Sequence, residues 1–410
     1  MSSGALNKTD SAAYDILLVA GNSEGFRLRQ HSSTRISETE TPFHPKRTVF
    51  SSIPSALLWS GNCHLHSMLS QTVPRLRRSP VTVEWITRTG DIRTLAPDWR
   101  PLQSTVKNRT VFSSFDLLAA WYENYAGDYG GEPLIGLARG GGRLFGVASL
   151  VVRSGCLGKI PLTRVEFATH GAFLDSLAGE TKFDLICLNG IEQGTPQFQA
   201  IEESAKRDRL AIEMTNHPIA IVDLSNGYNS YCQAMSRNFR RTLKRQEQRV
   251  SEAGEPALDG VRLNSGIDRL ESSIERLYAI TEASYKLKGQ RLRDDHRGYL
   301  GDLARNFAAL GMLHLSTLSI GGRDAAVVMG LVERGCYYDV TLAYVEEFAA
   351  LSPGAYLMQQ VLRDLAERGV HTLVSHGAHD YKLRWSTSFV PNLAAFAMPR
   401  GKTIWIIVGY

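Results

Sequence analysis

The chain has 410 residues, of which 43% are hydrophobic and 21% charged, and it carries 46 basic against 41 acidic residues. This length suits about two domains plus an extension, and the nearly balanced charge argues against a protein dedicated to binding polyanions. No apolar run approaches the ~20 residues of a membrane-spanning helix, and five scattered cysteines argue against a disulfide framework, so we expect a cytoplasmic protein.

Residues 1–80 differ in composition from the rest of the chain. The stretch SSTRISETETPFHPKRTVFSS is rich in Ser, Thr, Pro and charge and has weak periodicity, which predicts a partly disordered N-terminal arm. Cys63, His64 and His66 are conceivable metal ligands, but a structural site needs a second ligand pair, and none has the usual spacing. We therefore expect no metal site.

The body of the chain repeats one layout. Pro133–Gly155 and Leu313–Gly335 each consist of two strand-like runs around a Gly-rich turn, which predicts two antiparallel hairpins. Helical patterns precede both, with apolar residues at Phe115, Leu118, Trp121 and Tyr125, then at Leu270, Ile274 and Leu277, then at Tyr299, Leu303 and Phe307. Two related α/β domains, residues 81–225 and 226–410, explain this pattern. The Gly-rich turn at 140–142 joins two strands, so we reject it as a nucleotide site.

A basic amphipathic helix is predicted between the two copies. Its apolar stripe comprises Tyr228, Tyr231, Cys232, Met235, Phe239 and Leu243. Arg240, Arg241 and Lys244 lie largely off that stripe, and we call them the basic face. This basic face is either an ordinary solvated surface or a positive wall that attracts an anionic cofactor tail, a phosphorylated substrate or RNA.

The run from Cys336 to Leu365 predicts a strand, a loop and a helix. Cys336–Tyr344 is rich in aromatic and β-branched residues, as strands are. Ser352 is suited to cap a helix that begins at Pro353, and Gly369 is suited to end it. Gly354 leaves room for close backbone approach, and free N–H groups at the helix start favour phosphate oxygens.

A dense polar cluster follows the next strand, which is predicted over Val370–Val374. It includes His376, Asp380, Tyr381 and Lys382 within one short segment. Crowding of titratable groups at a strand end is typical of sites with perturbed pKa values, so we expect catalytic residues here.

These segments together resemble one family of enzymes. The similarity is carried by Ser236-Arg237-Asn238 with Arg240-Arg241, by Tyr344, Phe348 and Leu351-Ser352-Pro353-Gly354, by Gly377, Tyr381-Lys382 and Trp385, and by the segment from Lys182 to Leu188. This pattern, over about residues 85–395, is similar to GNAT-type acetyltransferases associated with cellulose or exopolysaccharide biosynthesis. The resemblance implies two tandem GNAT-like units with mixed, largely antiparallel sheets, distantly similar to Fem-type aminoacyltransferases.

The resemblance also implies a donor site in the second unit, with the first unit degenerate and on the acceptor side. The implied donor-binding residues are Leu351, Ser352, Pro353, Gly354, Ala355, Tyr356 and Lys382. The usual diphosphate loop of the family reads Gln/Arg-x-x-Gly-x-Gly/Ala, and this chain supplies only the end of that pattern. Acyl-coenzyme A is the expected donor, and aminoacyl-tRNA is the alternative that Fem-type relatives suggest.

The expected reaction is direct acyl transfer to an amine or hydroxyl of a small molecule or saccharide, without a metal. Tyr381 is expected to protonate the leaving group, because GNAT enzymes often place a tyrosine after this strand. His376 or Asp380 is the candidate base, and Asp339 is held in reserve. A non-catalytic exopolysaccharide assembly factor is the alternative from a different class.

Overall fold

A computed structural model describes the body of the chain in segments. These are residues 15–18, 82–106, 110–127, 131–157, 160–167, 185–192, 198–199, 202–203, 210–216, 219–261, 269–284, 287–375, 380–390, 392–399 and 406–409. The chain divides into two compact units, one made of residues 1–79 with 404–410 and the other of residues 80–403. In the first unit, β1 (Asp15–Leu18) pairs antiparallel with β16 (Ile406–Gly409). The rest of the predicted arm, with Cys63, His64 and His66, lies outside the described residues.

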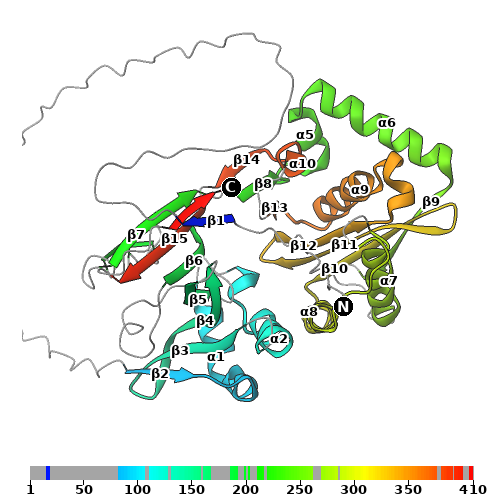
Figure 1. Cartoon of the computed structure of the whole chain (residues 1–410). Helices are drawn as coiled ribbons and strands as arrows, with labels where there is room; N and C mark the ends of the chain where they lie inside the picture. Colours follow the sequence, from blue (N-terminus) through cyan, green and yellow to red (C-terminus); the bar gives the residue numbers. More distant parts are fainter. Residues whose placement is uncertain are drawn as a thin grey trace, which may run out of the picture. The chain divides into compact units, whose positions relative to one another are not determined.

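The larger unit contains two seven-stranded sheets (Figure 1). In order across the first sheet, the strands are β2 (Thr82–Ile86), β3 (Glu132–Gly140), β4 (Arg143–Leu157), β5 (Ile160–Phe167), β6 (Leu185–Glu192), β15 (Asn392–Pro399) and β7 (Leu210–Asn216). Across the second they are β9 (Pro256–Val261), β10 (Leu313–Ile320), β11 (Arg323–Glu333), β12 (Cys336–Tyr344), β13 (Thr372–Ser375), β8 (Ile219–Asp223) and β14 (Ser388–Val390). Each sheet has one parallel pair, β5–β6 or β12–β13, at the same place in its order.

Both predicted hairpins are confirmed. β3 pairs with β4 around Gly141-Gly142, and β10 pairs with β11 around Gly321-Gly322. All four glycines have φ between 56° and 77°, the left-handed region that two-residue hairpin turns require. Each hairpin also has a register shift close to its turn. The two hairpins therefore share this irregularity in strand pairing as well as their layout.

The two sheets exchange strands. β15, which lies near the end of the sequence, sits between β6 and β7 in the first sheet. β8 sits between β13 and β14 in the second sheet, although it directly follows β7 in sequence. Each half of the chain therefore contributes a strand beside the parallel pair of the other. The proposed domain limits, 81–225 and 226–410, stay a prediction.

Helices cover the sheets. Those of the first half are η1 (Thr89–Leu95), α1 (Ala96–Thr105), η2 (Val111–Ser113) and α2 (Phe115–Tyr125). Those of the second are α5 (Gly227–Ala234), α6 (Arg237–Ala253), α7 (Leu270–Glu282), α8 (Asp294–Ala309), η3 (Glu346–Leu351), α9 (Pro353–Glu367) and α10 (Asp380–Leu383). The three predicted helical patterns are confirmed as α2, α7 and α8.

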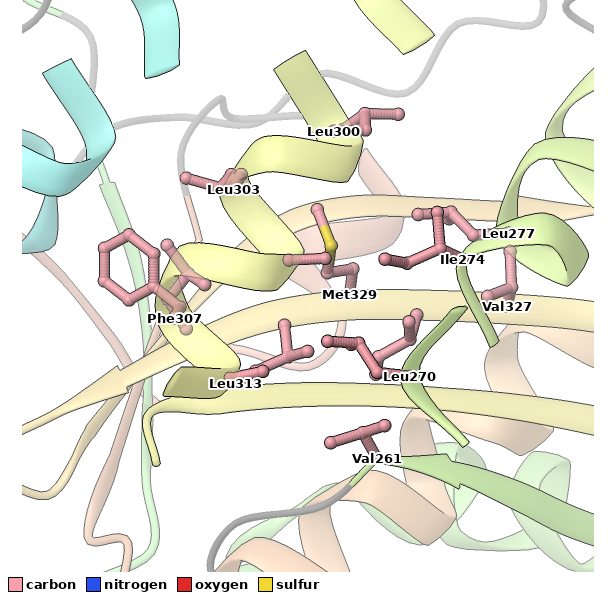
Figure 2. Packing of buried hydrophobic residues seen from close by; sticks show 14 of the residues in the cluster. Val261, Leu270, Ile274, Leu277, Leu300, Leu303, Phe307, Leu313, Val327 and Met329 are labelled. Carbon is pink, nitrogen blue, oxygen red and sulfur yellow. The ribbon is translucent and has the colours of Figure 1, made fainter. Parts of the chain in front are cut away.

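Two hydrophobic cores flank the second sheet. Figure 2 shows Ile274 of α7 and Phe307 of α8 packed over Val327 and Met329 of β11 on one face. On the opposite face α5, α6 and α9 form the other core, which contains Leu243, Val250, Leu357 and Leu362. Since both faces are buried, β11 is apolar almost throughout, as expected for a central strand.

The prediction of one continuous basic helix between the copies is wrong, because this segment forms two helices. α5 ends before Met235, whose backbone is extended (ψ 153°), and α6 begins after Ser236. The Ser236 hydroxyl accepts a hydrogen bond from the Phe239 N–H at 3.2 Å, which caps α6. The predicted apolar stripe nevertheless packs on the α9 side of the sheet as one continuous face.

Candidate functional site

The loop before α9 has the predicted boundaries but a different cap. Ser352 has φ 54° and ψ 51°, the left-handed region, and its side chain accepts no hydrogen bond from the helix. The prediction of a Ser352 side-chain cap is therefore wrong. A left-handed non-glycine residue costs of order 1 kcal/mol, and such strain is often found at functional sites.

Few backbone N–H groups are free at this helix start. The amides of Ala355 and Tyr356 donate to the Ser352 carbonyl oxygen at 3.1 and 3.2 Å, and Pro353 has no N–H. Among the described residues, the Gly354 N–H is the first-turn amide of α9 that has no acceptor. The expected array of free amides is thus reduced to one donor plus the positive end of the helix dipole.

Gly354 serves the packing of α9 against β12. A Cβ added here would lie 3.0 Å from Leu342 Cδ2 and 3.6 Å from Tyr344 Cδ1. The space that this glycine leaves is therefore occupied by strand β12, which corrects the expectation that it makes room for a ligand. Pro353 and Gly354 are buried, whereas the flanking Ser352 and Ala355 are half-buried, as are Leu351 and Tyr356.

Strands β12 and β13 separate next to this loop. Their parallel ladder covers only Cys336–Tyr338 against Thr372–Val374, whereas β12 continues to Tyr344. A register shift against β11 also leaves Val340 without a partner. From Asp339 onward the edge of β12 that faces away from β11 has no strand partner among the described residues, and we call this opening the fork. Unpaired strand N–H groups of this kind can bind an acyl carbonyl oxygen.

Asp339 occupies the apex of the fork. Its Oδ2 accepts a hydrogen bond from the Ser375 hydroxyl at 2.8 Å and lies 3.1 Å from Lys382 Nζ. The side chains of Lys382 and Asp339 are only 12% and 15% exposed. The other carboxylate oxygen, Oδ1, is buried and has no partner among the described residues. A buried acceptor without a partner is costly, so Oδ1 marks a position where a ligand N–H or O–H could be received.

Tyr337 lies two residues before Asp339 on the same strand. Its ring covers Gly330 so closely that any side chain there would overlap it. Burial, reinforced by the negative charge of Asp339, raises the pKa of this phenol well above its ordinary value of 10.0. Tyr337 is therefore neutral at physiological pH and is a buried core residue of β12 next to the fork.

The remaining predicted catalytic residues lie at the limit of what the structure describes. His376 falls outside the described residues, and so do the side chains of Asp380 and Tyr381, whose backbone opens α10. Lys382, predicted to contact phosphate, is instead found beside a carboxylate, which was the plain alternative for this residue.

The basic face lies on α6. Arg240, Arg241 and Lys244 are exposed, and the Arg240 guanidinium donates to the Gln233 carbonyl oxygen at 3.1 Å. α6 packs against both η3 and α9. The helix that carries this positive charge is thus in contact with the loop that starts α9, while its apolar side is buried in the core.

Ser375 was not singled out from the sequence as a site residue. It ends a short apolar strand, and strand alternation alone places it on the same face as Leu373. Its contact with Asp339 depends on the parallel register between two strands whose paired residues are 36 positions apart, and no local pattern reveals this register.

The described residues also bear on metal sites and on membrane-spanning helices. Within the described residues, no group of three or more His, Cys, Asp or Glu side chains is placed to hold a metal ion. No described helix has the length and apolar content needed to cross a membrane.

Part of the second half of the chain matches a known protein family. Residues 237–383 match the family model described as an acetyltransferase (GNAT) domain. No curated protein matches the sequence. Among solved structures, the chain is similar to FemX (TM-score 0.49, 12% identity, 77% of this chain and 96% of that one). It is also similar to a tandem GNAT protein from the clavulanic acid biosynthesis pathway (TM-score 0.42, 12% identity, 77% and 98%).

A conserved protein of unknown function from Bacteroides thetaiotaomicron VPI-5482 is also similar (TM-score 0.47, 13% identity, 77% of this chain and 100% of that one). The matched segment contains the fork and the loop before α9. The first sheet repeats the strand order of the second. The chain is therefore an α/β protein with two tandem GNAT-like units, and residues 237–383 of the second match the model of an acetyltransferase (GNAT) domain.

Proposed function

We propose that the protein transfers an acyl group from acyl-coenzyme A to an amine, or a hydroxyl, of a small molecule or saccharide. The observation that carries this proposal is the fork, with a carboxylate at its apex and a helix start beside it, inside the segment that matches a GNAT domain. Such a fork offers unpaired N–H groups to a thioester carbonyl, and the apex offers an acceptor for a proton.

In the proposed reaction the neutral nucleophile attacks the thioester carbonyl directly. The new bond to carbon forms as the carbon–sulfur bond breaks, and free N–H groups of β12 stabilise the negative charge on the carbonyl oxygen. Asp339 Oδ1 accepts the proton lost by the nucleophile, because Oδ2 is already occupied by Ser375 and Lys382. Tyr381 protonates the departing thiolate. His376 and Asp380 remain the alternative bases.

The donor diphosphate is proposed to lie at the start of α9. The Gly354 N–H and the helix dipole would favour it, and the left-handed Ser352 would turn the chain toward it. The basic face of α6 would draw the anionic donor toward this loop. Leu351, Ala355 and Tyr356 complete the proposed donor site, and Lys382 takes the role of a charge partner for Asp339.

An aminoacyl-tRNA-dependent transferase is the second candidate, and one observation favours it. Arg240, Arg241 and Lys244 are all exposed on one helix, and none forms an ion pair with another described residue. A solvated row of cations is what an RNA backbone would need. A role in cellulose or exopolysaccharide production and a cytoplasmic location are finer proposals, and a non-catalytic assembly role is the outcome if no donor is consumed.

Donor choice separates these possibilities. The full chain is incubated with radiolabelled acetyl-coenzyme A or with charged tRNA, each with a panel of amines and amino sugars. We expect transfer or slow hydrolysis from the thioester that ribonuclease does not affect. Transfer from tRNA alone, abolished by ribonuclease, would replace the first candidate with the second, and turnover of neither donor would indicate a binding protein.

A further inference from the structure

A separate cavity lies on the other side of β11 from the fork. Its volume is about 200 Å³, and it is open to solvent on one side and lined by residues of α9, β10 and the edge strand β9. Charged and polar side chains from α9 line it together with His314 of β10. None of them belongs to the proposed acyl-transfer site.

His314 lines this cavity and has one buried ring nitrogen without a partner among the described residues. Its side chain is 1% exposed, and its Nε2 lies 3.2 Å from Asp364 Oδ2. Because a carboxylate only accepts hydrogen bonds, Nε2 carries a hydrogen, and in the tautomer with this single N–H the Nδ1 atom is an acceptor. Nδ1 is buried and has no partner among the described residues.

Among the charged residues that line the cavity, one carboxylate has no ion-pair partner within the described part of the chain. Asp364 is engaged by His314 and by the Arg368 guanidinium at 2.9 Å, and Arg363 is engaged by Glu247 at 2.7 Å. Glu367 also lines the cavity and forms no ion pair within the described part of the chain. An anionic ligand would find the neighbouring cations already paired, whereas a cationic donor would meet both Glu367 and the imidazole acceptor.

Three apolar side chains share the lining with the polar side chains of Ser316 and Gln360. Leu258 of β9 and Leu357 and Val361 of α9 contribute carbon surface. A cavity of ~150 Å³ is large enough to bind benzene, so this one accommodates a compact molecule of slightly greater size. The lining therefore combines a hydrocarbon wall, one buried acceptor and one unpaired carboxylate.

We propose that this cavity binds a small primary ammonium compound. The ammonium N–H donates to His314 Nδ1, its charge faces Glu367, and its carbon chain lies against Leu258 and Leu357. This inference goes beyond the proposed acyl transfer and does not depend on it.

The test uses n-butylammonium chloride as the probe, with 1-butanol and sodium butyrate as neutral and anionic molecules of similar size. Calorimetric titration of the full chain without any acyl donor at about pH 8 keeps the amine charged and an ordinary imidazole neutral. We expect saturable binding of butylammonium, binding of butanol at least about tenfold weaker, and no binding of butyrate. The His314 ring nitrogens, followed by NMR, should shift with butylammonium alone.

Two variants and one control locate the binding. His314→Gln keeps an N–H for Asp364 but replaces the Nδ1 acceptor by an amide oxygen with different geometry, and Glu367→Gln removes the spare charge at an exposed position. Each should weaken butylammonium binding about tenfold or more, whereas Glu203→Gln, an exposed position in the first half of the chain, should not change it. Glu367→Gln decides the question if His314→Gln does not fold.

Failure of butylammonium to bind would overturn the proposal, as would butanol binding of equal strength. Unchanged affinity in Glu367→Gln would also overturn it. Because no acyl donor is present, none of these results bears on the proposed acyl transfer.

Discussion

At the scale of single residues, the two carboxylate oxygens of Asp339 have different surroundings. Oδ2 accepts a hydrogen bond from the Ser375 hydroxyl and forms an ion pair with Lys382. These two contacts hold the side chain in place and balance its charge. Oδ1 is left buried and unpartnered at the apex of the fork. A base positioned in this way needs no movement before it accepts a proton, which is the condition for efficient proton transfer.

We therefore predict that Asp339→Asn lowers kcat for acyl transfer about 10²- to 10⁴-fold, because an amide cannot accept the proton. The affinity for the acyl donor, measured by titration, should change little. Asp294→Asn is the matched control, since Asp294 is 88% exposed and belongs to α8. Activity that survives in Asp339→Asn would move the role of base to His376 or Asp380.

Tyr381→Phe tests the proposed acid separately. Removal of the hydroxyl should slow release of the thiolate and lower kcat, with the smallest effect for donors whose thiol leaving group is already acidic. Rates with a series of thioesters of different leaving-group pKa measure this. Equal rates for wild type and variant across the series would exclude Tyr381 as the acid.

Asp364 gives a residue-scale prediction about stability. Burial alone raises the pKa of this carboxyl, but hydrogen bonds from His314 and Arg368 outweigh burial and lower the pKa to about 2, from 3.8. Because the native pKa lies below the ordinary value, the ionised carboxylate stabilises the fold above about pH 4, and this contribution is lost as the pH falls toward 2.

Asp364→Asn should therefore lower the free energy of unfolding by about 1–2 kcal/mol at neutral pH, allowing for solvent screening. The difference from wild type should shrink between about pH 4 and pH 2, as measured by urea unfolding. A difference that stays constant over this range would show that lost packing, and not the carboxylate charge, is responsible.

At the scale of elements, the start of α9 combines two requirements at one glycine. Gly354 allows the helix to approach Leu342 and Tyr344 of β12, and it also carries the one first-turn N–H without an acceptor among the described residues. Packing and the proposed donor binding would therefore be coupled at this position. The strand that forms one side of the fork is the same strand that the helix presses against.

Gly354→Val is expected to lower the free energy of unfolding by about 1–3 kcal/mol, because the added methyl groups overpack against Leu342. Donor affinity should fall in the same variant as the helix start moves away from β12. Gly90→Val is the control, since a Cβ there meets nothing within 4 Å. Unchanged stability and unchanged donor affinity would together contradict this account of the helix start.

Elements whose cause is local could be predicted from sequence. The hairpins around Gly141-Gly142 and Gly321-Gly322 depend on adjacent alternating runs and on glycines that allow positive φ. The break between α5 and α6 was missed although its signal, Ser236 ahead of a helical run, was present. The left-handed Ser352 had no signal, because Ser-Pro-Gly is equally compatible with an ordinary cap.

The candidate site was predictable only in part for the same reason. Asp339 could be named because it lies in a recognisable strand, but its partner Ser375 is set by the register of a parallel pair. Likewise the pairing of β15 with β6 joins segments about 200 residues apart. Contacts over such separations leave no trace in periodicity or spacing.

At the scale of the whole molecule, the strand exchange makes the two GNAT-like units interdependent. β15 supplies a strand to the interior of the first sheet, and β8 does the same for the second. α2 of the first half also packs on α8 of the second, where Asn124 Nδ2 donates to Asp302 at 2.9 Å. Residues 80–403 form one compact unit by their contacts.

Separate expression of residues 81–225 and 226–410 should consequently yield two unstable polypeptides, because each loses an interior strand of its sheet. Circular dichroism and thermal unfolding of each piece measure this, and the full chain should unfold from residue 80 to residue 403 in one transition. A cooperative transition in either isolated piece would contradict this interdependence and support the predicted domain limits.

The central claim is that the acyl donor enters the fork between β12 and β13. A crystal structure of the full chain with a non-hydrolysable acyl-coenzyme A thioether tests it most directly. The account predicts the acyl carbonyl against the unpaired edge of β12 beyond Tyr338 and the diphosphate at the Gly354 N–H. A donor bound elsewhere on the chain, with the unpaired edge of β12 unoccupied, would contradict it.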